Sequence, residues 1–269
     1  MNKKTTPIFA IANQKGGVGK TTTAVNVSSY LAGRGVRTLL VDLDPQGNAT
    51  SSLGVEPQGA TLYDLLSGEE PAKEVIHLTS QTGLDLLPAS RDLAAAEVEF
   101  ASLPDRDKRL EIALEPILNN YDIVIIDCPP SLGLLTINAM SSSRGLIVPI
   151  QCEYLALEGL GHLVSTVQLV KSRINPTLEL FGIVMTMFDS RTRLSKQVVE
   201  EVQKHYPNKL FRTLIPRSVY LSEAPSYGQS IFEYYPSSKA ALAYSSLGEE
   251  FLDRIKRVYG LAFDSKPDH

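Results

Sequence analysis

The chain has 269 residues, of which 43% are hydrophobic and 21% are charged. This ordinary composition excludes disordered, collagen-like and fibrous proteins. The formal net charge of -4 excludes a strongly basic nucleic-acid coat protein, although it is compatible with a local basic patch. Two cysteines are too few for a disulfide framework and indicate a reducing compartment, so we expect a cytoplasmic protein.

Short apolar runs alternate with segments of helical character along the chain. The apolar runs are continuous, which is typical of strands buried on both faces of a parallel sheet. Their alternation with helices predicts an α/β fold with a doubly wound, mostly parallel sheet and helices on both faces. We expect strands at residues 8–12, 36–42, 121–127, 145–150, 180–188 and 210–215, and helices at 21–33, 91–103, 108–119, 158–173, 193–205 and about 237–259.

No Pro-, Gly- or Ser-rich linker and no internal repeat divides the sequence, so we expect a single domain over residues 1–269. A chain of this length can bury most of its apolar surface in one large core. No stretch approaches the ~20 apolar residues that cross a bilayer, and we therefore expect no membrane partner.

The first expected strand is followed by the sequence QKGGVGKTT at residues 14–22. Its glycines let backbone N–H groups converge on phosphate oxygens, and the N-terminus of the next helix adds a partial positive charge. This pattern predicts a P-loop NTPase in which Lys20 pairs with the β- and γ-phosphates and the Thr21 hydroxyl binds Mg²⁺. The loop is a variant, because Gln14 stands where the general pattern has glycine. The expected phosphate-binding residues are Lys15, Gly16, Gly17, Val18, Gly19, Lys20, Thr21 and Thr22.

The variant loop carries a second lysine, Lys15, five residues before Lys20. This lysine is either an ordinary surface charge or a group that reaches a nucleotide bound by another copy of the chain. In the second case it would stabilise phosphate charge in trans, as an arginine finger does.

Two carboxylates follow apolar strands, at the sheet edge where ligands of such folds bind. Asp44 lies just past residues 36–42 and would orient the attacking water or hold Mg²⁺ through water; the alternative is a turn cap. For Asp42, at the end of that strand, a structural role is equally compatible. Asp127 ends the run at 121–127 in the form of a Walker B segment, whose carboxylate holds Mg²⁺ directly or through water.

Three segments together resemble the ParA/Soj family of partition ATPases, which shares a deviant Walker A loop with MinD. They are KGGVGKTT at residues 15–22, VDLDPQGNAT at 41–50 and IIDCPPS at 125–131. The resemblance runs from about residue 8 to about 251. Its later segments, at 148–159, 186–192 and 215–226, are similar to the ParA/Soj branch rather than to MinD.

This resemblance implies an ATPase that uses ATP and Mg²⁺ and forms a nucleotide-sandwich dimer. Lys15 would contact the partner's phosphates, and Lys15, Lys20 and Asp44 would serve hydrolysis. The dimer would bind double-stranded DNA without sequence preference and so associate with the nucleoid. A ParB-like partner would stimulate slow hydrolysis during chromosome or plasmid segregation.

The resemblance also implies further contacts. The segment around Pro216 and Arg217 would lie near the adenine. In relatives an arginine contacts DNA where this chain has Tyr220, whereas Arg191 is kept at the other usual position. Residues 189–257 hold 11 Lys and Arg against 8 Asp and Glu, and this excess favours a DNA-binding patch there. The expected DNA-binding residues are Arg191, Arg193 and Lys196.

Three other functions remain open. A MinD-like membrane-associated ATPase would use the basic, apolar residues 255–263 as an interfacial helix. An iron–sulfur reductase would use Cys128 and Cys152, since two copies of the chain supply the four thiolates of a [4Fe–4S] cluster. A metabolic ligase would share the phosphate loop, but no residue set marks its substrate pocket.

Overall fold

The computed structural model describes residues 6–153 and 156–263, which form an eight-stranded sheet in the order β3-β4-β2-β5-β1-β6-β7-β8. All neighbouring strands run parallel except β3 and β4. This topology confirms the doubly wound, mostly parallel α/β fold that the sequence predicts. The strands are β1 (Ile8–Ile11), β2 (Thr38–Asp42), β3 (His77–Leu78), β4 (Leu84–Leu87), β5 (Ile123–Asp127), β6 (Gly145–Gln151), β7 (Glu179–Phe188) and β8 (Leu210–Pro216).

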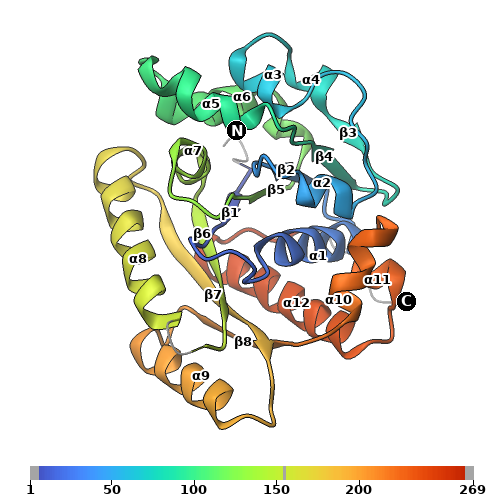
Figure 1. Cartoon of the computed structure of the whole chain (residues 1–269), viewed down its shortest axis with the longest axis vertical. Coiled ribbons are helices and arrows are strands. Elements are labelled where there is room, and N and C mark those ends of the chain that lie inside the picture. Colours follow the sequence, from blue (N-terminus) through green and yellow to red (C-terminus); the bar gives the residue numbers. More distant parts are fainter. Residues whose placement is uncertain (1–5, 154–155, 264–269) are drawn as a thin grey trace.

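Helices cover both faces of the sheet (Figure 1). On one face α1 and α12 lie side by side, and on the other lie α5 to α8. The α-helices are α1 (Lys20–Gly33), α2 (Asn48–Ser52), α3 (Leu62–Ser67), α4 (Ala72–Val75), α5 (Leu93–Glu99), α6 (Arg109–Leu114), α7 (Leu134–Ser142), α8 (Ala156–Arg173), α9 (Arg193–His205), α10 (Tyr220–Glu223), α11 (Ile231–Tyr234) and α12 (Lys239–Tyr259). Short 3₁₀ turns are η1 (Phe100–Ser102), η2 (Arg106–Lys108), η3 (Glu115–Asn120) and η4 (Ala224–Tyr227).

The central strand β1 divides the core into two clusters. Ile8 and Ala10 face the cluster under α5 to α8, whereas Phe9 and Ile11 face the cluster under α1 and α12. The Phe9 ring lies 4.7 Å from that of Phe181 on β7, measured between centroids. Every residue of β1 is buried, which explains why its sequence shows no polar alternation.

The six expected strands are present, with bounds that agree to within two residues. The sequence prediction missed the edge strand β3, its neighbour β4, the buried helix α7 and the short helices α2, α3, α4, α10 and α11. Strand β4 is only four residues long and is interrupted by Asp85, whose carboxylate accepts a hydrogen bond from the Tyr121 hydroxyl at 2.8 Å. Helix α7 contains Thr136 and Asn138, which have low helix propensity and lie buried in this structure.

Two expected helices are shorter than predicted and end in 3₁₀ turns. The helix expected at 91–103 is α5 followed by η1, and the one at 108–119 is α6 followed by η3. Pro116 lies at the start of η3, where its missing N–H and its ring end the α-helical pattern.

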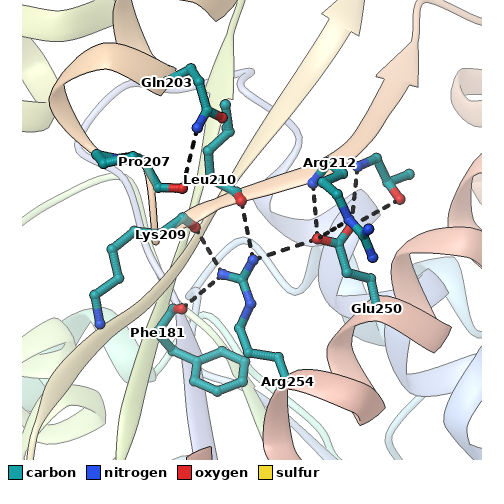
Figure 2. Close-up of polar contacts among 9 residues, drawn as sticks. Phe181, Gln203, Pro207, Lys209, Leu210, Arg212, Glu250 and Arg254 are labelled. Atoms are coloured by element: carbon teal, nitrogen blue, oxygen red, sulfur yellow. Dashed lines mark hydrogen bonds and ion pairs between the residues drawn. The ribbon is translucent and has the colours of Figure 1, made fainter. Parts of the chain in front are cut away.

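A buried arginine on α12 connects the last two strands (Figure 2). Arg254 is 5% exposed, and its side chain donates hydrogen bonds to three backbone carbonyls, those of Phe181, Lys209 and Leu210, at 3.0, 2.8 and 3.1 Å. One turn earlier, Glu250 accepts the backbone N–H groups of Arg212 and Thr213. These contacts fix edge strand β8 against α12.

We expect Arg254→Met to lower the free energy of unfolding by about 3 kcal/mol or more, because two buried carbonyls and one partly buried carbonyl lose their donor. The matched control is Arg257→Met on the same helix, whose side chain is exposed and whose loss should cost about 0.5 kcal/mol or less. Urea unfolding of both variants measures the difference. Equal losses would contradict the role assigned to Arg254.

Candidate nucleotide site

The variant phosphate loop joins the carboxyl end of β1 to the first residue of α1. Gly17 and Gly19 have positive φ angles of 71° and 86°, a region that disfavours side chains. The Val18 carbonyl accepts a hydrogen bond from the Thr186 hydroxyl of β7 at 2.8 Å. The loop is therefore held in a left-handed curl from the side of β7, with Gly16 exposed and Thr21 and Thr22 in the first turn of α1.

Lys20 lies inside the loop rather than on the surface. The residue is 7% exposed, and its Nζ donates to the Lys15 carbonyl at 3.2 Å. Burial lowers the pKa of its ammonium, while Asp127, Cys128 and Asp44 act in the opposite direction. A buried ammonium with one neutral acceptor is suited to binding an anion.

Asp127 ends β5 beside the phosphate loop. It is fully buried, and neither carboxylate oxygen has a hydrogen-bond partner among the described residues. Burial raises the pKa of Asp127 well above the usual range, and the Asp42 carboxylate, its register partner on β2, raises it further. Thr21 and Lys20 act in the opposite direction and lower this pKa. Two orphaned carboxylate oxygens near a threonine hydroxyl and a second carboxylate, Asp44, fit the oxygen ligands that Mg²⁺ takes.

Asp42 has a structural role, as the sequence allowed. One of its carboxylate oxygens accepts from the backbone N–H and the hydroxyl of Thr50, both at 2.7 Å. The Thr50 hydroxyl accepts in turn from the Ala89 N–H at 3.1 Å. Asp42 thus fixes the start of α2 against the sheet, and burial raises its pKa to about 6.

Asp44 follows β2 at the same edge. It is 6% exposed, and one of its carboxylate oxygens accepts from the Gln46 N–H at 3.0 Å. That contact is a local turn, the structural alternative considered above, but it occupies only one of the two carboxylate oxygens. The segment from Asp44 to Gly47 is closed by a hydrogen bond from the Gly47 N–H to the Asp44 carbonyl.

A cavity of about 130 Å³ brings Gly19 and Thr22 together with Pro216 and Arg217. The two segments are almost 200 residues apart in the sequence, and parallel strands β7 and β8 bring them together. The cavity is also lined by Thr186, Met187, Ile215, Ser218, Leu221, Ser222 and Tyr244.

Met187 is a residue that sequence reasoning missed. Its φ of 51° is the one positive value among the described non-glycine residues. Such strain in a non-glycine residue persists only where neighbours enforce it and gathers at functional sites. No pattern in the sequence marks this backbone angle, although Met187 lies in the segment 186–192 that carries the family resemblance.

Lys15 does not point at the phosphate site of its own loop. Its ammonium forms an ion pair with Glu153, just past the end of β6. Glu153 is a second residue that the sequence reasoning did not single out, and only the pairing of β1 with β6 brings it close.

The three expected DNA-binding residues lie at the start of α9, with Arg191 two residues before the helix and Arg193 and Lys196 within it. Arg191 is 87% exposed and makes a bidentate contact with Asp189, at 2.9 and 2.7 Å. Its hydrogen bonds hold the pKa of the Asp189 carboxyl at about 2. Arg193 and Lys196 are exposed on α9. Tyr220 packs edge-on against Tyr235.

Apolar groups behind two of the other functions pack inside the protein, although Lys256, Arg257 and Val258 are exposed. Within residues 255–263, Ile255 is fully buried and the Tyr259 ring stacks on Phe181 at 5.8 Å, so apolar side chains of this segment pack on its own sheet. Cys128 and Cys152 are both buried. Across residues 6–153 and 156–263, no helix is long and apolar enough to cross a membrane.

Comparison with known proteins places this geometry in context. A family model described as an AAA domain matches residues 6–180. The sporulation initiation inhibitor protein Soj of Bacillus subtilis is 51% identical over 245 residues, which cover 90% of this chain and 97% of Soj. The chromosome partitioning protein ParA of Myxococcus xanthus is 49% identical over 249 residues, which cover 92% of this chain and 88% of that protein.

A solved structure shares the fold over nearly the full length. Cobyrinic acid a,c-diamide synthase from Mycobacterium smegmatis, crystallised with ADP and magnesium, has a TM-score of 0.82 and 36% identity. The match covers 98% of this chain and 100% of that chain. The relatives at 51% and 49% identity cover 90% and 92% of this chain. They indicate the same family as the variant phosphate loop and the two carboxylates at the sheet edge. This chain belongs to the ParA/Soj family of chromosome-partitioning ATPases.

Proposed function

We propose that this protein binds ATP with Mg²⁺, dimerises around the nucleotide and binds double-stranded DNA without sequence preference. Hydrolysis, stimulated by a ParB-like protein, then releases the DNA during chromosome or plasmid segregation. The observation that carries the proposal is the fully buried Asp127, whose two oxygens have no partner among the described residues, beside the buried ammonium of Lys20. Binding of a metal–phosphate group would satisfy both charges.

The roles of the site residues follow from their positions. Backbone N–H groups of residues 16–22 and the Lys20 ammonium would bind the phosphates, and Thr21 and Asp127 would hold Mg²⁺, with Asp44 reaching it through water. The cavity at Pro216 and Arg217 would take the adenine. The related Mycobacterium structure binds ADP and magnesium, which supports this choice of ligands.

Hydrolysis needs little covalent chemistry from the protein, because phosphoryl transfer depends on positioning and charge stabilisation. Mg²⁺ supplies charge neutralisation at the phosphates. Lys20 would stabilise the developing negative charge, and Asp44 would orient the attacking water through its second oxygen. Lys15 of a second copy would add positive charge at the same phosphates.

The exposed basic residues Arg191, Arg193 and Lys196 support DNA binding. Nonspecific affinity for DNA comes mostly from phosphate neutralisation, and a dimer doubles the number of cations presented. Dimerisation would thereby make DNA binding depend on ATP. Arg191 would exchange its Asp189 partner for a phosphate, while Arg193 and Lys196 contribute directly.

A ligase remains the second candidate, because the solved relative at 36% identity is named as an amide synthase. The relatives at 49% and 51% identity are named as partition and sporulation proteins instead. Binding to duplex DNA distinguishes the two functions.

DNA binding is the first test of the proposal. We expect tight, salt-sensitive binding to a random duplex with ATP and weak binding with ADP or without nucleotide, measured by fluorescence anisotropy across a salt series. In Arg191→Glu, the dependence of log affinity on log salt should fall by about 1 or more per protomer, with ATP-dependent dimerisation intact. Binding that ignores the nucleotide would refute the partition function, and an unchanged Arg191→Glu would place the patch elsewhere.

We expect Asp44→Ala to bind ATP and dimerise normally but to hydrolyse ATP about 100-fold or more slowly, because the carboxylate that orients water is lost. Phosphate release under single-turnover conditions measures the rate. Asp42→Asn is an informative comparison, since it should instead weaken folding by disturbing α2. Normal turnover in Asp44→Ala would exclude this role.

We expect Asp127→Asn to lose Mg²⁺-dependent ATP binding and yet to raise the stability of the nucleotide-free protein by about 1 kcal/mol or more. Because the pKa of Asp127 is raised on folding, the folded protein keeps a proton that the unfolded chain releases, and this penalty on folding grows as the pH rises above the ordinary range of an aspartate. The gain should therefore be larger at pH 8 than at pH 5 in denaturant unfolding. A loss of stability at pH 8 would contradict this account.

A further inference from the structure

Lys15 is held on its own protomer by contacts of both its side chain and its backbone. Its ammonium pairs with the Glu153 carboxylate, and the two side chains are 54% and 45% exposed. Its backbone N–H donates to the Asn13 side chain at 3.0 Å, which in turn donates to the Pro149 carbonyl of β6 at 2.7 Å. Lys15 is thus connected to the end of β6 twice, through Asn13 and through Glu153.

A third contact links Lys15 to the nucleotide site. The Lys20 ammonium donates to the Lys15 carbonyl at 3.2 Å. Phosphate oxygens would compete for this ammonium, since charge-assisted hydrogen bonds are stronger than those to a neutral carbonyl. Nucleotide binding would then remove one restraint on the Lys15 backbone, while the Glu153 ion pair would remain.

We propose that Glu153 is a positioning residue that retains the Lys15 ammonium on its own protomer until the ATP-bound dimer forms. The inference rests on the proposed function, in which Lys15 contacts the partner's phosphates. An ammonium paired with Glu153 is not available for that contact, so each protomer must break this pair when the dimer assembles. The polyphosphate of the partner then replaces the carboxylate as the counter-ion.

The exposure of the pair sets the size of the effect. A half-exposed ion pair changes an equilibrium by only about 1.5- to 5-fold. Two such pairs break per dimer, so their combined effect on dimerisation is about 2- to 30-fold. Glu153 therefore biases the protein toward the monomer and does not block dimerisation.

The test measures the dimer dissociation constant by sedimentation velocity with Mg²⁺ and a non-hydrolysable ATP analogue. Glu153→Gln, which removes the charge and keeps the shape, should strengthen the dimer about 2- to 30-fold. Glu153→Asp keeps the carboxylate and should stay close to the unmodified protein. Glu158→Gln is the matched control, because Glu158 is exposed on α8 and makes no ion pair with the described residues.

A purely structural role for Glu153 would change the ADP affinity of the monomer in Glu153→Gln, whereas the proposal leaves that affinity unchanged. ADP affinity of the monomer should be the same in Glu153→Gln and in the unmodified protein, since the release of Lys15 belongs to the dimerisation step, and the stability of the monomer should fall by no more than about 1 kcal/mol, the contribution of one exposed ion pair. A dimer that is weakened in Glu153→Gln, or unchanged as in Glu158→Gln, would overturn the inference. If the unmodified protein forms no dimer with the ATP analogue, the proposed function itself fails, and this inference with it.

Discussion

Asp127 is a carboxylate buried at the edge of the sheet, where the Thr21 hydroxyl and the Lys20 ammonium favour its charged form, and much of the surrounding structure is arranged around its charge. Strands β1, β2 and β5 end together, so that Ile11, Asp42 and Asp127 lie in one register row. Burial and the neighbouring Asp42 both favour protonation of Asp127, while Lys20 and Thr21 oppose it. An uncompensated charge of this kind destabilises the protein without ligand, and a bound cation would remove the penalty.

The rest of the fold holds the groups around that charge in place. Thr186 on β7 fixes the Val18 carbonyl of the phosphate loop, and Asn13 connects the same loop to β6. On the other side, Asp42 fixes α2 through Thr50. Strand β8, which carries Pro216 at its end, is attached to α12 by Arg254. A site assembled from this many strands needs the whole sheet to be rigid, which explains buried hydrogen bonds far from the nucleotide.

Charged pairs on the surface have a different part in the structure. The pairs Lys15–Glu153 and Arg191–Asp189 each neutralise a cation that the proposed function needs. Both cations are more than half exposed, so their pairs are weak and can be exchanged for phosphate groups. The whole-chain charge of -4 is a poor guide to this behaviour, because the relevant cations lie in a few places and are paired locally.

The sequence by itself determined the parts of the protein that are coded locally. Continuous apolar runs identified the strands β1, β2, β5, β6, β7 and β8. The glycines, together with Lys20 and Thr21, identified the phosphate loop. Both signals are local, because the burial of a strand and the curl of a loop depend on residues that are neighbours in the sequence. The short strands β3 and β4 and the buried helix α7 escaped, since tertiary packing overrides their weak local preferences. Only the tertiary structure decided that Lys15 meets Glu153, that Met187 adopts a left-handed backbone, and that Gly19 and Pro216 line one cavity. The first and the last of these relations join residues far apart in the chain, and the order of strands in the sheet, which no local pattern encodes, brings those residues together.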